Sequence, residues 1–278
     1  MKNDKIFVSV LVSLTLQWCN AFAPIFIGGF QFPKFPWDND SDNGNSKGSV
    51  SYLEPGDTIA VIGASGNVGK LVSLRLSDTY KVNGIVRSST PELLQFFEGR
   101  EDSIKLYEMD LLEELNGDDN NEGENKLIPA LKDANAIVIC TGTTAFPTEA
   151  WSKSGDFSVT NEVLKSLLDN KFSVNDAIRD LDELGLNTPN NVDNRANSLV
   201  LDTWASFGRV SKKRVIMLSS IGVQRRGSMP FPILNACGVL TAKAKGEAKL
   251  MEAAADGGYS YTIIRPVSVT AYCNRNFT

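Results

Sequence analysis

Three glycines spaced three residues apart, Gly63, Gly66 and Gly69, form the pattern in this 278-residue chain that most directly suggests chemistry. They follow an apolar, β-branched run over 58–62, which predicts a buried strand, and they precede a run over 70–76 whose leucines have helical spacing. The first glycine allows a tight turn, the second lets a phosphate approach the backbone, and the third lets the helix pack closely on the strand. This order of elements predicts a site for the diphosphate of a dinucleotide. The alternative is a turn whose glycines have only a structural role.

The same turn supplies the first set of predicted cofactor contacts. Free N–H groups and the positive end of the helix dipole favour an anion at the start of a helix. We therefore expect the dinucleotide to contact Gly63, Ser65, Gly66, Asn67, Val68 and Gly69.

The second predicted strand, over 81–86, is followed by Arg87 and three hydroxyl residues at 88–90. A site for NAD(H) usually has Asp or Glu here, about 20 residues beyond the turn, to bind the ribose 2′-hydroxyl. No carboxylate follows this strand, whereas a guanidinium and hydroxyls suit a 2′-phosphate. The sequence therefore predicts NADP(H) in preference to NAD(H). The alternative for Arg87 is a solvated strand end.

Two further strands, predicted over 104–109 and 136–140, also end in polar residues. Ligands of open parallel sheets bind beyond the carboxyl ends of the strands. We therefore expect Asp110 near the adenine and Thr141 and Gly142 near the cofactor. Asp110 has an alternative role as the cap of a helix that begins with the next residue. Strands that alternate with helices predict an α/β fold, a Rossmann-type doubly wound parallel sheet forming a single domain over 55–278.

The composition excludes several kinds of site. The chain has no histidine, which removes Ser-His-Asp triads and most zinc sites, and its carboxylates lack ligand spacing, so we expect no metal. The net charge is −5 and the one basic stretch, Ser211–Arg214, precedes an apolar run, which argues against nucleic acid as the main partner. None of the four cysteines forms a C-x-x-C pair, and Cys140 ends an apolar run, which predicts a buried free thiol.

The amino terminus has the pattern of a targeting leader. A basic start and an apolar run of about 11 residues predict a signal peptide over 1–21, and the apolar run is too short to span a bilayer. The letters Cys19-Asn-Ala-Phe-Ala-Pro24 resemble the cleavage junction of nucleus-encoded plastid proteins in diatoms and related algae, with cleavage before Phe22. The segment over 22–49 is then a disordered, transit-peptide-like segment, although its aspartates depart from that pattern. We expect the protein in the plastid stroma; the alternative is secretion.

Several blocks, in their order along the chain, resemble the atypical short-chain dehydrogenases/reductases of the NAD(P)H-binding branch common in plastids and cyanobacteria. The blocks are Val61–Gly69, Val86–Arg87, Thr188–Asp193, Arg214–Gly222, Gly238–Glu247 and Tyr261–Pro266. The resemblance covers about 57–269. It implies a Rossmann fold with a small, variable substrate region near the carboxyl terminus.

The resemblance also implies site residues. Ser219 and Ser220 match the serine position beside the nicotinamide, and Lys243 matches a lysine that contacts the nicotinamide ribose in relatives. We expect Ser220 and Lys243 to be catalytic, with Ser219, Lys243 and Arg265 near the nicotinamide. The alternatives are that the serines only cap the strand end, and that Lys243 is a surface residue or pairs with Glu247 one turn away.

The chain departs from the family's pattern at three places. The tyrosine expected four residues before the active-site lysine is Val239 here, and no tyrosine lies between Ser220 and Lys243. An insertion over about 152–187 contains two stretches with helical spacing, over 161–168 and 176–184, which could form a lid, a site for a protein partner, or decoration. The carboxyl end is expected to be short, because relatives continue beyond this point.

Two functions therefore stay open. The first is an NADPH-dependent reductase of an unidentified small organic substrate. The second is a non-catalytic NADP(H)-binding protein, a redox sensor or an assembly protein, with a partner at the insertion. An exposed apolar helix face on the insertion would favour the second function, and a lid over the nicotinamide would favour the first.

Overall fold

The computed structural model describes residues 52–116, 125–152 and 159–266. Every described residue belongs to a single compact unit of the chain. The predicted signal peptide and transit-like segment lie outside the described residues, as do the positions after Pro266.

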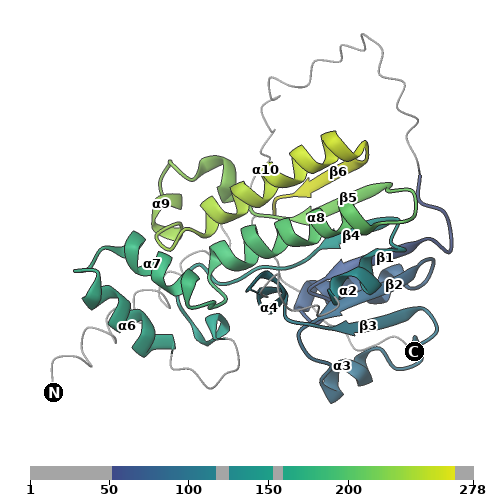
Figure 1. The fold of residues 1–278 in the computed structure, drawn as a ribbon, viewed down its shortest axis with the longest axis horizontal. Coiled ribbons are helices and arrows are strands. Elements are labelled where there is room, and N and C mark those ends of the chain that lie inside the picture. Colours follow the sequence, from purple (N-terminus) through teal and green to yellow (C-terminus); the bar gives the residue numbers. More distant parts are fainter. Residues whose placement is uncertain (1–51, 117–124, 153–158, 267–278) are drawn as a thin grey trace, which may run out of the picture. The chain divides into compact units, whose positions relative to one another are not determined.

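A six-stranded sheet, parallel throughout, forms the centre of this unit (Figure 1). The strands are β1 (Thr58–Ile62), β2 (Lys81–Val86), β3 (Ile104–Glu108), β4 (Ala136–Ile139), β5 (Arg214–Leu218) and β6 (Ser260–Ile264). Their order across the sheet is β3-β2-β1-β4-β5-β6. This order confirms the predicted doubly wound Rossmann-type fold. The predicted strand positions are confirmed as well, and the central strands β1 and β4 are the apolar runs that both cores bury.

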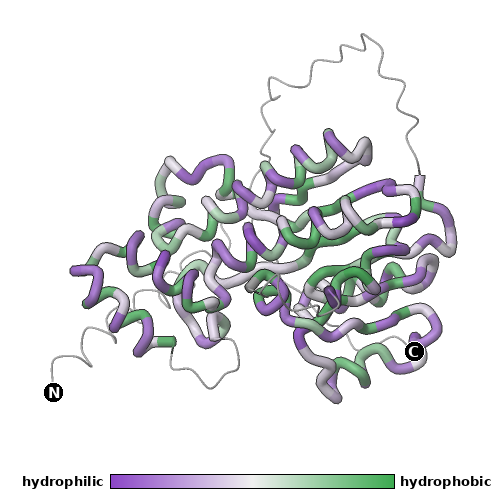
Figure 2. Tube along the Cα trace, in the orientation of Figure 1, coloured by the Kyte–Doolittle hydropathy of each residue, from purple (hydrophilic) through white to green (hydrophobic). Residues whose placement is uncertain are grey.

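Helices cover both faces of the sheet. The helices are α2 (Asn67–Leu76), α3 (Pro91–Phe96), α4 (Leu111–Asn116), α5 (Leu127–Leu131), α6 (Val159–Asp169), α7 (Val174–Glu183), α8 (Asn197–Phe207), α9 (Phe231–Leu234) and α10 (Val239–Gly257). Alternate residues of each strand point to opposite faces, so one core packs against α5, α8 and α10 and the other against α2 and α3. Figure 2 shows hydrophobic segments gathered along the central strands.

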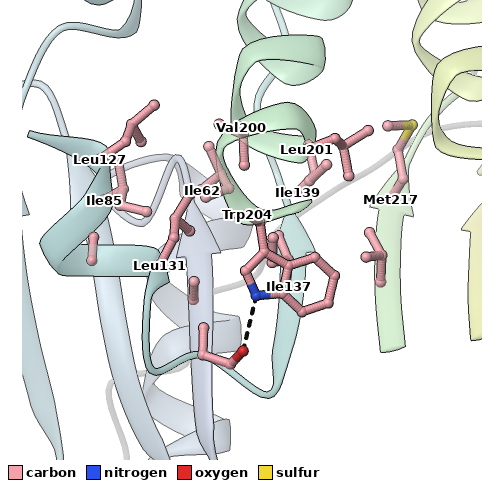
Figure 3. Packing of buried hydrophobic residues seen from close by; sticks show 14 of the residues in the cluster. Ile62, Ile85, Leu127, Leu131, Ile137, Ile139, Val200, Leu201, Trp204 and Met217 are labelled. Carbon is pink, nitrogen blue, oxygen red and sulfur yellow. Dashed lines mark hydrogen bonds between the residues drawn. The ribbon is translucent and has the colours of Figure 1, made fainter. Parts of the chain in front are cut away.

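Trp204 of α8 anchors the first core. Its side chain is fully buried among strand and helix residues, and its indole Nε1 donates a hydrogen bond to the carbonyl of Ala134 at 2.9 Å (Figure 3). The bond satisfies the one polar atom of this side chain, so nearly all of its apolar surface is removed from water without leaving a donor unpaired. Truncation of a buried tryptophan typically costs about 3–5 kcal/mol.

The predicted insertion forms the helix pair α6 and α7, which confirms both helical stretches. The pair has a small core of its own, built from Trp151, Val159, Leu181 and Leu186. The described residues also form three further helical elements: η1 (Glu149–Trp151), the π-helix η2 (Asn190–Ala196) and η3 (Ile221–Arg225).

Candidate dinucleotide site

The parallel register brings the carboxyl ends of the central strands to one edge. Ile62 of β1 lies opposite Ile85 of β2 and Ile139 of β4. The residues that follow these strands therefore leave the sheet together. Since β2 and β4 flank β1 on opposite sides, this edge is the topological switch point, where open parallel sheets bind their ligands.

A cavity of about 220 Å³ opens at this edge. Its lining includes the predicted cofactor residues Gly63, Ser65, Gly66, Arg87, Asp110, Thr141 and Gly142. Residues from four different strand ends are thus collected at one place, as the sequence predicts. Asn67, Val68 and Gly69 lie just outside the lining, at the start of α2.

The glycine turn is required by the fold itself. Gly63 has a φ of +79°, in the left-handed region that disfavours other residues. A Cβ on Gly69 would lie 2.1 Å from the Gly63 carbonyl oxygen, so α2 could not approach the strand this closely with any other residue there. A Cβ on Gly66 would be 3.3 Å from the same oxygen, a tight but smaller conflict. The positive φ therefore explains Gly63 and the close approach of α2 explains Gly69, whereas steric conflict explains Gly66 only in part.

The first turn of α2 is free of side-chain caps. Gly66 precedes the helix in an extended conformation and makes no side-chain cap bond, and the turn contains no acidic residue. The N–H groups of Asn67, Val68 and Gly69 therefore point out of the helix end without an intrahelical acceptor. Such a helix end attracts an anion through these donors and through its dipole.

A carboxylate lies where the sequence suggests none. The Ser89 amide, two residues after Arg87, donates a hydrogen bond to Glu108 Oε2 at 3.0 Å. The reason is the register, since Val86 at the end of β2 pairs with Glu108 at the end of β3. The expectation that no carboxylate lies at the end of β2 is therefore wrong, because Glu108 of β3 reaches it. Basic and acidic side chains also line a neighbouring cavity of about 560 Å³. Its lining includes Arg87, Ser88, Glu108, Asp110, Glu113, Lys126 and Glu149.

Asp110 has the capping role that the sequence leaves open as an alternative. Its Oδ1 accepts a hydrogen bond from the Leu112 amide at 2.8 Å, so it caps α4. It also lines the cavity. The capping oxygen is engaged in the protein, which leaves the other carboxylate oxygen as the atom to face an adenosine.

The turn after β4 connects the cavity to α8 and α10. Thr141 donates its hydroxyl to Asn197 Oδ1 at 2.7 Å, which ties this turn to the start of α8. A Cβ on Gly142 would lie 3.5 Å from Lys243 Nζ. The ammonium of Lys243 therefore reaches the carboxyl end of β4, although it is not part of the cavity lining.

Lys243 makes a buried ion pair that the sequence does not reveal. Its Nζ lies 2.7 Å from Asp193 Oδ1, and the two side chains are only 15% and 2% exposed. Burial raises the pKa of Asp193, and the Lys243 ammonium opposes that rise. The partner is therefore Asp193, and the alternative pairing with Glu247 is wrong. Lys245, two residues along α10, is exposed.

The π-helix η2 brings Asp193 to Lys243. A Cβ on Gly246 would lie 2.4 Å from the Asp193 carbonyl oxygen, so this glycine lets α10 contact the backbone of η2. A single π-helical turn of this kind is frequent at functional sites.

Glu247 occupies the centre of a second buried network. The carboxylate accepts the Ser219 hydroxyl, and the Arg265 guanidinium binds both of its oxygens at 2.9 and 2.7 Å. The pair with Glu247 raises the pKa of Arg265. Ser219 and Arg265, both predicted near the nicotinamide, therefore use these side-chain groups to hold β5, β6 and α10 together. Ser220 precedes η3 and is half-buried.

Comparison with solved structures gives the same fold. A protein from Burkholderia multivorans classed as a short-chain alcohol dehydrogenase aligns over 78% of this chain and 86% of its own, with 15% identity and a TM-score of 0.50. The two proteins share a fold. A 3-oxoacyl-[acyl-carrier protein] reductase from Brucella melitensis aligns over 78% and 76%, with 12% identity and a TM-score of 0.48. A variant of ElxO with NADPH bound aligns over 77% and 73%, with 19% identity and a TM-score of 0.41. No family model matches the sequence, and no curated protein matches it.

Within this fold, the two described helices of the insertion lie outside the lining of the cavity. Ala150 and Asn187, at its two ends, line the cavity, whereas no residue of α6 or α7 does. These helices and the turns that end them instead expose the large apolar side chains Leu164, Leu168, Phe172, Val174 and Leu184. Lys171 and Phe172, in the turn between the helices, both have positive φ, a conformation that costs free energy in non-glycine residues.

Metal and membrane features are absent from the described part of the chain. The described residues include no group of three or more Cys, Asp or Glu side chains that could hold a metal ion. Within the same residues, every helix is too short or too polar to cross a bilayer.

Proposed function

We propose that this chain is an NADP(H)-binding member of the short-chain dehydrogenase/reductase family, and that it is an NADPH-dependent reductase of a small organic substrate. The observation that carries the proposal is the cavity at the switch point, where the glycine turn and the uncapped start of α2 meet three other strand ends. The fold shared with a dehydrogenase supports the same conclusion.

The cavity offers a distinct group of residues to each part of the cofactor. The amides over 65–69 would bind the diphosphate, and Arg87 with the hydroxyls after it would bind the 2′-phosphate. The free oxygen of Asp110 would face the adenosine. Thr141, Gly142 and Lys243 would lie toward the nicotinamide, since they surround the end of β4. Bound NADPH supplies a hydride, and the protein supplies orientation.

Reduction of the substrate also requires a proton, and we look for its donor among the residues of the chain. With no histidine in the sequence, and no tyrosine between Ser220 and Lys243, the donors we propose are these two residues themselves. Asp193 holds the Lys243 ammonium beside Gly142, which limits the motion of this side chain. A positioned general acid typically contributes a factor of about 10²–10⁴ to the rate.

Titration of the purified full chain with NADPH and NADH, by calorimetry and cofactor fluorescence, tests the proposal. We expect NADPH to bind more tightly than NADH. Arg87→Glu should weaken NADPH at least tenfold and leave NADH little changed, whereas Arg179→Glu, on the exposed surface of α7, should change neither. No heat and no fluorescence change with either cofactor would overturn the proposal.

The second candidate is a non-catalytic NADP(H)-binding protein, a redox sensor or assembly protein. The exposed apolar side chains of the α6–α7 pair favour it, and so do the missing tyrosine and the engagement of Ser219 by Glu247. Single-turnover oxidation of bound NADPH by a panel of ketones, aldehydes and enones separates the two candidates. Turnover that falls at least a hundredfold in Lys243→Met supports the reductase; tight NADPH binding without turnover supports the second candidate.

We also propose a plastid location, on the sequence of the leader alone. A fusion of residues 1–49 to a fluorescent protein, expressed in a diatom, should accumulate in the plastid. Phe22→Ala should divert the fusion to the secretory route, because the junction requires the aromatic residue. Secretion of the unaltered fusion would contradict the proposal.

A further inference from the structure

Glu108 accepts a hydrogen bond from an amide in the segment that forms the proposed 2′-phosphate site. The Ser89 N–H lies directly after Arg87 and Ser88 in the chain, among the groups that would bind a phosphate. In this structure the N–H donates to Glu108 Oε2 at 3.0 Å. A phosphate placed against Arg87 would lie in the same cavity as the Glu108 carboxylate, and it could use this N–H only by displacing Glu108 from it.

The two side chains favour different cofactors. The Arg87 guanidinium attracts a 2′-phosphate and has no comparable preference for a hydroxyl. A carboxylate accepts a hydrogen bond from a ribose 2′-hydroxyl, as the acidic residue after the second strand of many NAD sites does, and it repels a phosphate. Here the carboxylate comes from β3 and reaches the same place because Val86 and Glu108 are paired across the sheet.

Other carboxylates around the cavities are placed differently. One oxygen of Asp110 is engaged as the cap of α4. Glu113 is exposed on α4, and Glu149 belongs to η1, which follows the β4 turn in the chain. Of the carboxylates that line the two cavities, Glu108 is the one with a described hydrogen bond to the segment after Arg87.

We propose that Glu108 is a specificity-determining residue at the ribose 2′ position, and that Arg87 and Glu108 together set the selectivity between NADP(H) and NAD(H). Arg87 draws the 2′-phosphate to this edge, and Glu108 opposes it while accepting the 2′-hydroxyl of NAD(H). The chain therefore discriminates less strongly between the two cofactors than Arg87 alone would allow. This inference depends on the proposed function.

Glu108→Gln is the variant that tests it. The amide oxygen of glutamine can still accept the Ser89 N–H, so the local fold is kept while the charge is removed. We expect NADPH to bind about fivefold more tightly, which is the effect of removing one unit charge at close range in water. NADH should bind severalfold more weakly. Glu113→Gln is the matched control, since it removes a carboxylate from the same cavity and should leave both dissociation constants unchanged.

The salt dependence of binding and a second substitution give two further tests of the role of the Glu108 charge. The gain in NADPH affinity should shrink as the salt concentration rises toward about 1 M, where exposed charges are strongly screened. In an Arg87→Gln background, the Glu108→Gln substitution should still move the ratio of the two dissociation constants in the same direction. An unchanged ratio in Glu108→Gln, or an equal change in Glu113→Gln, would overturn the inference while leaving the proposed function intact. Failure of the unaltered chain to bind either cofactor would instead overturn the proposed function.

Discussion

Lys243 of α10 and Asp193 of η2, fifty residues apart in the chain, form a nearly buried ion pair 2.7 Å long beside the turn that follows β4. The pair places one positive charge next to Gly142, at the end of the cavity where the nicotinamide is proposed to lie. It also links the insertion side of the molecule to the longest helix, because η2 follows the insertion directly.

Removal of Lys243 should destabilise the protein in a pH-dependent way. Lys243→Met leaves Asp193 buried without its cation, which typically costs about 3–5 kcal/mol. Burial already raises the pKa of Asp193, and loss of the ammonium raises it further. The penalty falls on the charged carboxylate, so it is full above the folded-state pKa and disappears as acid protonates the group. Chemical denaturation at pH 8 and pH 5 should show the larger deficit at pH 8.

Two controls accompany this prediction. Lys245→Met removes an exposed lysine two residues away and should change the free energy of unfolding by less than about 0.5 kcal/mol. Adding Asp193→Asn to Lys243→Met should restore part of the lost stability at pH 8, because no charge is then buried alone. A deficit that is equal at both pH values would show that the lost contacts are not electrostatic.

The glycines of the turn should separate into structural and binding roles. Gly69→Ala places a Cβ 2.1 Å from a carbonyl oxygen, so we expect a loss of more than about 3 kcal/mol or failure to fold. Gly66→Ala meets a milder conflict at 3.3 Å and should fold, with a cost of about 1 kcal/mol, yet bind NADPH at least tenfold more weakly. Denaturation midpoints and calorimetry measure the two effects.

Gly227→Ala is the matched control, because a Cβ there would meet no atom within 4 Å. It should leave stability and cofactor affinity unchanged. If Gly66→Ala binds NADPH normally, the glycines have only the structural role that the sequence leaves open as an alternative.

The Glu247 network should stabilise the fold more than an exposed ion pair does. Glu247 is nearly buried and holds both Ser219 and Arg265, so Glu247→Gln should cost about 1–3 kcal/mol in denaturation experiments. Asp202→Asn breaks the exposed pair with Lys249, also on α10, and should cost less than about 0.5 kcal/mol. Equal effects of the two substitutions would contradict the structural role given to Glu247.

Cys140 should react slowly with alkylating reagents despite lining the cavity. Burial raises the pKa of its thiol to about 11, and only the thiolate is nucleophilic. At pH 8 we expect alkylation, followed by mass spectrometry of the Cys140 peptide, to be about a hundredfold slower than in denatured protein. The rate should rise steeply as the pH approaches 11. The folded state favours the neutral Cys140 thiol. The stability that this preference contributes is therefore lost as the pH rises toward the folded-state pKa of about 11.

Cofactor protection extends the Cys140 experiment. NADPH at saturation should slow the labelling of Cys140 further and leave that of Cys237, which is outside the cavity lining, unchanged. Equal protection of both thiols would indicate global stabilisation and would not locate the cofactor.

The sequence by itself determined the fold class and the first half of the site. The apolar, β-branched run over 58–62 predicts a strand buried on both faces, and Gly63 and Gly69 define a turn that other residues do not permit. The helices of the insertion follow from their spacing alone. All of these are local patterns, in which the relevant residues are neighbours in the chain.

Only the tertiary structure decided which charges meet. Glu108 and Ser89 are 19 residues apart, and Ser219 and Glu247 are 28 apart. Sheet register brings the first pair together, and the packing of α10 against β5 brings the second. Ion pairs and hydrogen bonds between distant residues depend on how whole elements pack, so the spacing of residues along the chain does not predict them. For this reason the sequence identifies Lys243 but not its partner Asp193, and Arg87 but not the carboxylate of Glu108 beside it.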